Sequence, residues 1–306
     1  MARVGRFGFL VNPRAERLTR GDLAARLASV VRRVSGVLLS PSDLQPDRIA
    51  SFDAIVVAGG DGTVRPALGP AMAARVPLLP FPAGTANDLA VRAGHGHDPE
   101  GIPAALEAGR SVAFRPVLAN GAPFACYAAV GLGASASAIR ARHRAALGLV
   151  RRVAPDAVGT IATLLAIAGK QDRLPAVRVA FGEDGSAEPQ GPSRRIAGLY
   201  VFALDVVNRT VRVADGWDWD GLEIVAALVP QLPRQRLAAA LRRIRRRGDF
   251  RDDTEVDVAS GRRIAVALDG ADAACFADGE PAGIERRFVF ERAPEPVRLV
   301  LPAPAP

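Results

Sequence analysis

Hydrophobic positions in the first third of the chain follow two different spacings. Short apolar runs occupy Phe7–Val11, Val37–Leu39, Ala54–Ala58 and Pro77–Leu79. The run at Ala54–Ala58 is continuous and rich in β-branched residues, which is typical of a parallel strand covered on both faces. The segments between these runs carry apolar residues at helical spacing. Alternating strands and helices predict an α/β domain with a doubly wound parallel sheet.

Three helices are expected among these strands. Apolar residues from Ala15 to Val34 recur every three or four positions, and arginines fill much of the opposite face. Further helices are predicted from Thr63 to Arg75 and from about Thr85 to Arg92. Residues 94–97, with two histidines, are most simply interpreted as an exposed loop.

The pattern changes after about Val112. Short strand-like segments punctuated by Gly, Asp and Pro occupy Phe124–Val130, Ala176–Phe181, Ile196–Leu204, Thr210–Val213, Leu222–Val229, Arg263–Leu268 and Arg287–Phe290. Two helices are predicted at about Ile139–Gly169 and Pro233–Arg247. We therefore expect an α/β domain at 1–113 and a mostly β domain with inserted helices at 114–290. Residues 291–306 form a tail that could return to the first domain.

Composition excludes several classes of protein. Of 306 residues, 49% are hydrophobic and 24% are charged, as in globular rather than disordered chains. Cys126 and Cys275 cannot build a disulfide framework, and with three scattered histidines they offer no zinc spacing. The first residues show no signal-cleavage pattern. The longest nearly apolar stretch, Val153–Gly169, is shorter than the ~20 residues that span a bilayer. We expect a cytoplasmic protein.

A glycine-rich loop follows the buried run at Ala54–Ala58. It reads Gly59-Gly-Asp-Gly-Thr63 and leads into a predicted helix. Glycine lets the backbone approach a ligand closely, and N–H groups at a helix start favour phosphate oxygens. Asp61 is unusual in such a loop, because an acid beside a phosphate calls for a divalent cation or a proton transfer. A tight turn with Asp61 as a local cap is the alternative.

A second polar loop follows the run at Pro77–Leu79. Within it, Gly84 allows close approach, while Thr85, Asn87 and Asp88 supply donors and acceptors. Because the carboxyl ends of neighbouring parallel strands meet at one edge of a sheet, the two loops predict a ligand crevice. Taken alone, this loop could also be a simple helix cap.

The two loops, with other landmarks in order, resemble the diacylglycerol kinase catalytic domain family. That family includes bacterial lipid kinases and sphingosine kinases, and NAD kinases and phosphofructokinases are its distant relatives. The similarity extends over most of the chain and rests on Asn12-Pro13, Gly59–Thr63, Pro82–Asp88, Ala129–Gly133, Asp218-Trp-Asp-Gly-Leu222 and Ala277-Asp-Gly-Glu-Pro281. The ordered set is a far more specific signal than any single motif.

The resemblance implies an α/β nucleotide domain, a β-sandwich-like lipid domain and ATP in the cleft. The residues that would line the nucleotide site are Asn12, Pro13, Arg14, Ala15, Glu16, Ser40, Gly59, Gly60, Asp61, Gly62, Thr63, Val64, Arg65, Gly84, Thr85, Asn87 and Asp88. Asp278 and Glu280 would sit at the reacting hydroxyl, with Glu280 favoured as general base and Asp61 as a further catalytic acid. Asp220 and the carbonyls of Trp217 and Leu222 would hold Mg²⁺.

Simpler interpretations of these acidic residues stay open. Asp278-Gly279 is a common hairpin-turn dipeptide, and Asp218 with Asp220 could belong to a solvated loop. The chain also departs from the family pattern. Arg65-Pro66 stands where the family has Asn-Glu, the early loop lacks the usual Ser-Gly, and Ala86 replaces a glycine. Pro66 falls in the first helical turn, where proline is tolerated, so the helix should survive.

The net charge of +8 is concentrated in one segment. Residues 231–247 contain seven arginines and no acid, so the rest of the chain is close to neutral. Leu237, Leu241 and Ile244 form one apolar stripe there. A basic amphipathic helix favours transient contact with an anionic membrane, and a packed surface helix is the alternative. Aromatic residues are only 5%, which makes nucleic acid the weakest candidate partner.

These observations predict an ATP- and Mg²⁺-dependent kinase that phosphorylates the hydroxyl of a diacylglycerol-like lipid. A first alternative is a kinase of a soluble substrate such as NAD, which would share the first glycine loop. A second is a non-catalytic lipid- or nucleotide-binding relative, suggested by Arg65-Pro66 and the altered early loop.

Overall fold

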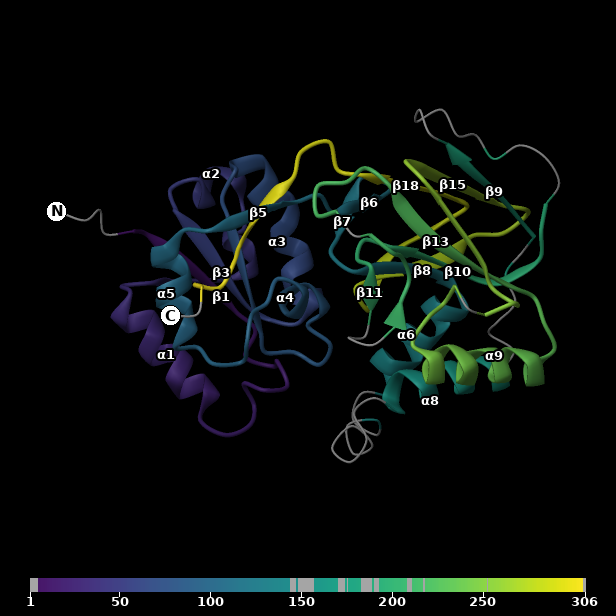
Figure 1. Cartoon of the computed structure of the whole chain (residues 1–306), viewed down its shortest axis with the longest axis horizontal. Helices are drawn as coiled ribbons and strands as arrows, with labels where there is room; N and C mark the ends of the chain where they lie inside the picture. The colour runs from purple at the N-terminus through teal and green to yellow at the C-terminus, as the bar shows by residue number, and fades with distance from the viewer. Residues whose placement is uncertain are drawn as a thin grey trace. The chain divides into compact units, whose positions relative to one another are not determined.

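A computed structural model describes residues 5–143, 147, 157–169, 174, 176–182, 189, 193–207, 211–216, 218–251 and 253–304. The chain divides into two compact units (Figure 1). Unit 1 comprises residues 1–116, 218–221 and 293–306, and unit 2 comprises residues 117–217 and 222–292. Unit 1 is therefore assembled from three separate segments of the chain.

Unit 1 is built on a six-stranded sheet in the order β2-β1-β3-β4-β19-β5. The parallel strands are β1 (Phe7–Val11), β2 (Val37–Leu39), β3 (Ala54–Gly59), β4 (Leu78–Pro82) and β19 (Val297–Val300), whereas β5 (Ser111–Phe114) is antiparallel. From β1 the chain adds β2 on one side and β3 on the other, so the strand order reverses there. The predicted doubly wound α/β fold is confirmed.

Helices flank this sheet. They are α1 (Leu23–Arg33), α2 (Pro46–Ile49), α3 (Asp61–Ala74), α4 (Asp88–Arg92) and α5 (Gly101–Ala108). The core forms where apolar helix positions meet strands that are buried on both faces. Leu27 and Val30 of α1 pack with Phe9, Val56 and Leu79 of the sheet. Every residue of β3 is buried, as its continuous apolar sequence predicts.

Two helices begin later than the spacing of apolar residues predicts. Ala15 and Leu18 are buried in the core, but they lie in turns rather than in a helix, and α1 begins only at Leu23. Asn87 has a φ of 58°, so its left-handed backbone cannot belong to α4, which begins at Asp88. In the first of these places, apolar residues of a looped segment imitate helical spacing.

The C-terminal tail contributes an interior strand to unit 1. Leu299 of β19 pairs with Leu78 of β4 on one side and with Val112 of β5 on the other. The strand is too short to show a period in the sequence. The C-terminal tail is therefore part of the six-stranded sheet of unit 1.

Unit 2 contains two antiparallel sheets, with strand orders β14-β13-β10-β8-β16-β17 and β7-β6-β18-β15-β9. Their bounds are Val117–Ala119 (β6), Ala122–Phe124 (β7), Tyr127–Gly131 (β8), Val177–Gly182 (β9), Ile196–Phe202 (β10), Ile224–Pro230 (β13), Asp257–Gly261 (β14), Arg263–Leu268 (β15), Ala273–Ala277 (β16), Glu280–Glu285 (β17) and Arg287–Arg292 (β18). A small pair, β11 (Val206–Val207) and β12 (Val211–Arg212), stands apart. Phe124 and Phe288 of one sheet share a core with Val130 and Leu199 of the other, so the two sheets form a sandwich.

Three helices line the outer face of the six-stranded sheet of unit 2 (Figure 1). They are α6 (Leu132–Arg142), α8 (Ala157–Ala168) and α9 (Arg234–Arg247). Leu132, Ala166 and Leu237 of these helices pack in one cluster with Ala227 and Val229 of β13. Within the described residues, no helix combines the length and the apolar character needed to cross a membrane.

The start of α6 corrects the sequence prediction, which placed this helix at about Ile139. The helix begins at Leu132, immediately after β8. Its first turns are rich in small residues, so they show little apolar spacing. Gly131 makes the strand-to-helix corner with a φ of 79°.

Candidate functional site

Three loops of unit 1 meet at one edge of its sheet, because the carboxyl ends of parallel strands lie together. They follow β1, β3 and β4 and carry most of the nucleotide-site residues expected from the sequence. Asn12, at the end of β1, donates from Nδ2 to Oγ1 of Thr63 at 3.1 Å. Its Oδ1 accepts the backbone N–H of Arg14 at 3.0 Å. The first two loops are thereby joined at the point where the strand order reverses.

Close backbone contact joins the loops after β3 and β4. A Cβ atom on Gly84 would lie 2.5 Å from the Cα of Gly60 and 2.8 Å from its nitrogen. The backbone N–H groups of Ala83 and Gly84 both donate to the carbonyl of Gly59, at 3.0 and 3.1 Å. Only glycine at position 84 permits this approach, so the glycines act in packing one loop against the other.

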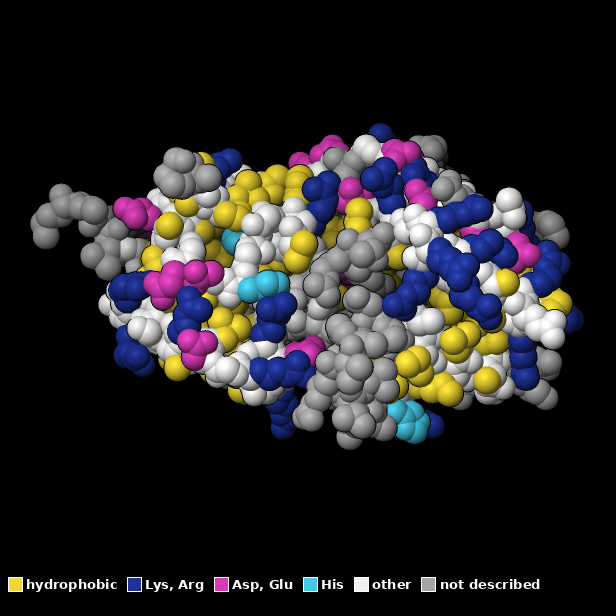
Figure 2. All heavy atoms as spheres, turned by 60° about the horizontal axis from the view of Figure 1, so that its bottom comes forward, with side chains coloured by type: hydrophobic (Ala, Val, Ile, Leu, Met, Phe, Trp, Pro, Cys, Tyr) yellow, Lys and Arg dark blue, Asp and Glu magenta, His cyan; other side chains and the backbone are white. Residues whose placement is uncertain are grey.

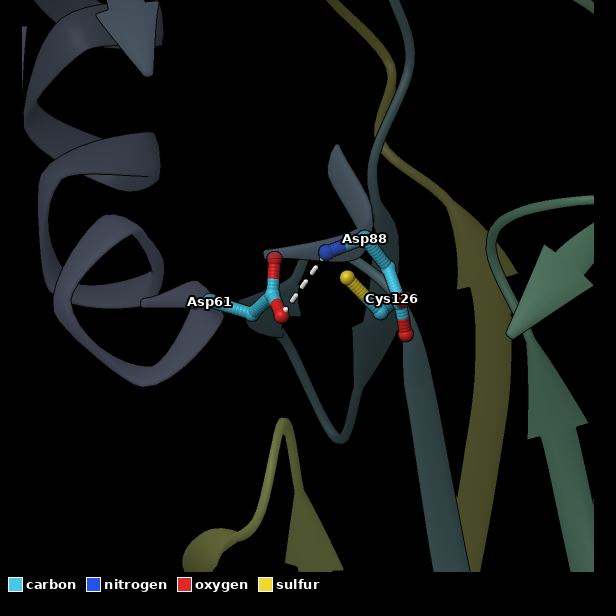
Figure 3. Close-up of side chains that lie close together, drawn as sticks. All are labelled: Asp61, Asp88 and Cys126. Carbon is cyan, nitrogen blue, oxygen red and sulfur yellow. Dashed lines mark hydrogen bonds between the residues drawn. The ribbon is translucent and has the colours of Figure 1, made fainter. Parts of the chain in front are cut away.

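Asp61 links the same two loops through its carboxylate. One oxygen accepts the backbone N–H of Asp88 at 3.1 Å, as Figure 3 shows, and the other accepts that of Leu89 at 3.2 Å. Asp61 therefore caps the first turn of α4, a helix distant in sequence, rather than its own helix. The positive end of α4 stabilises the negative charge at this position.

The second loop is held by its own side chains. Asn87 is 1% exposed, and its Oδ1 accepts the N–H of Gly84 at 2.7 Å while its Nδ2 donates to the Gly84 carbonyl at 2.8 Å. Thr85 donates its hydroxyl to Oε2 of Glu16 at 2.9 Å, and Glu16 also pairs with Arg20 at 3.3 Å. Asn87 is thus a structural brace, and Thr85 and Glu16 connect this loop to the loop after β1.

The other residues predicted to line the nucleotide site lie in different parts of unit 1. Pro13 and Arg14 lie in the turn after β1, whereas Ala15 and Val64 are buried and offer a ligand only their backbone. Gly62, Thr63 and Arg65 lie in the first turns of α3. The helix continues through Pro66 as expected, although it begins at Asp61 and Pro66 is its sixth residue, beyond the first turn. Ser40 follows β2 and donates its hydroxyl to Asp43 at 2.5 Å, which holds the pKa of that carboxyl below its usual range.

Residues 94–97 form a loop, as expected, and Gly94 and Gly96 are exposed, but His95 and His97 are half-buried and brace this part of unit 1. His97 donates from Nδ1 to the carbonyl of Pro82 at 2.9 Å, and His95 donates from Nε2 to that of Val300 at 2.8 Å. Burial lowers the pKa of His95. The carbonyl partners belong to β4 and β19, 15 and 205 residues away in sequence, so no turn or helix spacing indicates this role.

In unit 2, Asp278 and Gly279 form the turn between β16 and β17, and Glu280 begins β17. Asp278 and Gly279 have φ values of 52° and 81°, which fits a two-residue hairpin with both central residues left-handed. The carboxylate of Asp278 accepts three backbone N–H groups, from Ala125 at 2.7 Å, Cys126 at 2.8 Å and Tyr127 at 3.3 Å. Asp278 therefore fixes the corner before β8, while Glu280 is exposed at the start of β17.

A cationic side chain that sequence reasoning missed lies beside this turn. Arg140 of α6 hydrogen-bonds the hydroxyls of Tyr127 and Ser137, each at 3.3 Å. A Cβ atom on Gly279 would lie 3.4 Å from its Nη2. Tyr200 is half-buried near this group, and desolvation raises its pKa. Arg140 thus supplies a positive charge next to the Asp278–Gly279 turn.

Of the residues expected to hold Mg²⁺, Asp220 is engaged by an arginine. Asp220 Oδ1 accepts from both Nε and Nη2 of Arg115, at 2.9 and 2.8 Å. The same guanidinium donates to the carbonyls of Asp220 at 3.3 Å and Ala293 at 2.8 Å, and to that of Pro294. Trp217 lies outside the described residues, and Leu222 is assigned to unit 2.

Arg115 occupies the chemical role that a dication would take at Asp220. Its guanidinium joins segment 218–221, the end of β5 and the start of the C-terminal segment. A Mg²⁺ ion on the same carboxylate would lie beside this fixed positive charge, which opposes binding. The residues present therefore fit an arginine cross-link better than a structural Mg²⁺ ion.

Together, the doubly wound unit with paired glycine loops and the sandwich unit define a two-domain fold of the kind expected from the motifs. Residues 43–117 match the family model of the diacylglycerol kinase catalytic domain. The matched segment contains both glycine loops, and the resemblance inferred from the motifs is confirmed. The match supports a phosphotransferase. No curated protein matches the chain in sequence.

Solved structures agree with this fold. A candidate diacylglycerol kinase from Bacillus anthracis strain Sterne is 18% identical, with 97% of each chain covered and a TM-score of 0.70. Another structure of a diacylglycerol kinase from that strain is 15% identical, with 97% of each chain covered and a TM-score of 0.66. Yeast NADH kinase complexed with NADH is 10% identical, covers 98% of this chain and 84% of its own, and has a TM-score of 0.50. At these identities the likeness concerns the fold.

Proposed function

We propose that the protein is an ATP-dependent lipid kinase that phosphorylates the hydroxyl of a diacylglycerol-like lipid. The observation that carries the proposal is the interlocked pair of glycine loops at the switch point of the parallel sheet, within the segment that matches the family model. Ligands of open α/β sheets bind at such a switch point. The backbone geometry there suits phosphate groups.

The proposed donor site is the start of α3. Helix geometry leaves its first N–H groups without partners inside the helix, and the helix dipole adds positive potential. Gly60 and Gly62 present these groups without a side chain in the way. The hydrogen bond between Asn12 and Thr63 fixes both polar side chains at this edge. Mg²⁺ bound to the nucleotide would neutralise phosphate charge during transfer.

Glu280 is the proposed general base. Asp278 is committed to three backbone N–H groups, whereas Glu280 is exposed just beyond the rigid hairpin turn. In the proposed step, the carboxylate of Glu280 accepts the proton of the lipid hydroxyl. The hydroxyl oxygen bonds to the γ-phosphorus as the bond to the ADP oxygen breaks. Products are a phosphorylated lipid and ADP.

The test replaces Glu280 by Gln and compares it with Glu285→Gln. Glu285 is exposed on the same strand, so both variants lose one carboxylate of β17. We expect Glu280→Gln to lower phosphate transfer from labelled ATP to diacylglycerol in mixed micelles by at least ~100-fold. Glu285→Gln should retain transfer close to wild type. Equal activity of both variants would remove Glu280 from the mechanism.

A further inference from the structure

The helix α9 has three distinct faces. Leu237, Ala240 and Ile244 are buried and pack on the sandwich. With ~100° between successive residues, Arg236 and Arg243 lie together on one flank of this stripe. The same spacing places Arg234, Arg242, Arg245 and Arg246 on a sector of about 120° roughly opposite the buried stripe. The helix therefore separates its arginines into two groups.

The arginines on the flank are neutralised. Arg236 pairs with Glu255 at 2.7 Å, and Arg243 pairs with Asp253 at 2.8 Å and Glu255 at 3.1 Å. The hydrogen bond from Arg236 holds the pKa of Glu255 below its usual range, so this acid stays charged. These acids lie just beyond the basic segment in the sequence. The charge available for a partner is therefore smaller than the seven arginines suggest.

The outer sector keeps its positive charge. Within the described part of the chain, no carboxylate lies at ion-pair distance from Arg234, Arg242 or Arg246. Arg242 and Arg246 are exposed one turn apart, and Arg234 is exposed at the start of the helix. Figure 2 shows Lys and Arg side chains gathered over α9. Exposed arginines gathered on one side of a helix attract an anionic surface.

Apolar side chains of α8 lie beside the outer arginines of α9. Arg245 donates a hydrogen bond to the hydroxyl of Thr160, which fixes α8 along α9. Leu164 and Leu165 of α8 are 39% and 48% exposed. Leu164 lies one helical turn after Thr160, on the same side of α8. Hydrophobic side chains next to the arginines are visible in Figure 2.

We infer that this surface, the outer arginines of α9 with Leu164 and Leu165 of α8, docks on an anionic membrane. Arginines would bind lipid phosphates, and the leucines would enter the boundary between head groups and acyl chains. Exposed leucines favour a membrane over nucleic acid, since nucleic acid offers no acyl layer. The inference deepens the proposed function by naming how a lipid substrate would be reached, and it rests on that function for its purpose only.

The test measures vesicle binding without ATP, on phosphatidylcholine vesicles with and without phosphatidylglycerol. We expect the wild-type chain to sediment with the anionic vesicles and to remain in solution with the neutral ones. Arg242→Gln with Arg246→Gln should weaken this binding about thirtyfold, at roughly 1 kcal/mol for each charge. Leu164→Ser with Leu165→Ser should weaken binding even at low salt, where screening is slight.

The matched control is Arg32→Gln with Arg262→Gln, which removes the same charge from exposed positions elsewhere. It should bind like wild type. Equal losses in the control and in Arg242→Gln/Arg246→Gln would overturn the inference, as would equal binding to neutral vesicles. Phosphate transfer to lipid in micelles is measured separately. Transfer without vesicle binding would refute the docking surface alone, and binding without transfer would refute the kinase alone.

Discussion

Gly84 is the residue on which the geometry of the two loops depends most closely. Gly84→Ala would place a methyl group 2.5 Å from the Cα of Gly60, a backbone atom that cannot move freely. We expect a loss of about 1–3 kcal/mol in unfolding free energy and a marked loss of ATP binding, since the loops must separate. Gly96→Ala is the control, because its Cβ would meet open space. Calorimetric ATP binding equal in both variants would contradict this account.

Asp278 should matter for stability rather than as the base. Asp278→Ala removes an acceptor of three backbone N–H groups and places alanine at a φ of 52°. We expect unfolding free energy to fall by about 3 kcal/mol, measured in urea. Asp278→Asn tolerates the backbone and keeps one oxygen, so its loss should be smaller. A stability like wild type in Asp278→Ala would show that the corner is held by other contacts.

The sequence predicts which residues gather at the site better than it predicts their roles. The glycine loops and their positions after β3 and β4 follow from local pattern. Asp61 and Asp278, however, accept N–H groups from segments distant in sequence, and no local motif encodes those partners. Asp61 and Asp278 each hold backbone segments in place, whereas Glu280 is the exposed acid of the predicted pair in unit 2.

At the scale of the elements, Arg115 holds the segment 218–221 in place through its hydrogen bonds to Asp220. Arg115→Ala removes hydrogen bonds to Asp220 and to two C-terminal carbonyls, and we expect a loss of about 2 kcal/mol in unfolding free energy. Arg48→Ala, which breaks an exposed pair with Asp43, should cost less than ~1 kcal/mol. The thermal midpoint of the ligand-free wild type should not change with EDTA or Mg²⁺. A large rise of the thermal midpoint on addition of Mg²⁺ would instead support a metal site at Asp220.

His95 should make the packing of β19 sensitive to pH. Burial lowers its pKa, so below the unfolded value of about 6.5 the unfolded chain binds more protons than the folded chain. Its contribution to stability is present above that pH and is lost as the pH falls towards the folded pKa. His95→Gln should flatten the dependence of urea unfolding on pH in this range. An unchanged slope would show that His95 does not titrate on unfolding.

At the scale of the whole molecule, sequence periodicity predicts the class of each unit but not the closure of unit 1. Strand–helix alternation and the later short strands identify the α/β and the β-rich regions. The insertion of β19 between β4 and β5, by contrast, is a long-range pairing of a four-residue strand. The basic helix α9 is a second example, because Asp253 and Glu255 neutralise its flank arginines, Arg236 and Arg243, only once the chain has folded.

A charge placed in the C-terminal strand β19 tests this closure. Leu299 is fully buried, so Leu299→Asp places a charge in the core of the sheet of unit 1. We expect it to lower unfolding free energy by more than ~4 kcal/mol, with proteolysis concentrated in unit 1. Arg298→Asp, at the exposed neighbouring position, is the control and should remain folded. Wild-type stability in Leu299→Asp would contradict the interior position of β19.

Comparison of phosphate acceptors tests the central claim most directly. The chain is incubated with ATP labelled at the γ-phosphate and with either diacylglycerol in mixed micelles or NAD, and labelled products are separated. We predict labelled phosphorylated lipid and no labelled NAD product. Transfer to NAD but not to lipid would assign a soluble acceptor. Tight ATP binding without transfer to any lipid hydroxyl would contradict the kinase itself.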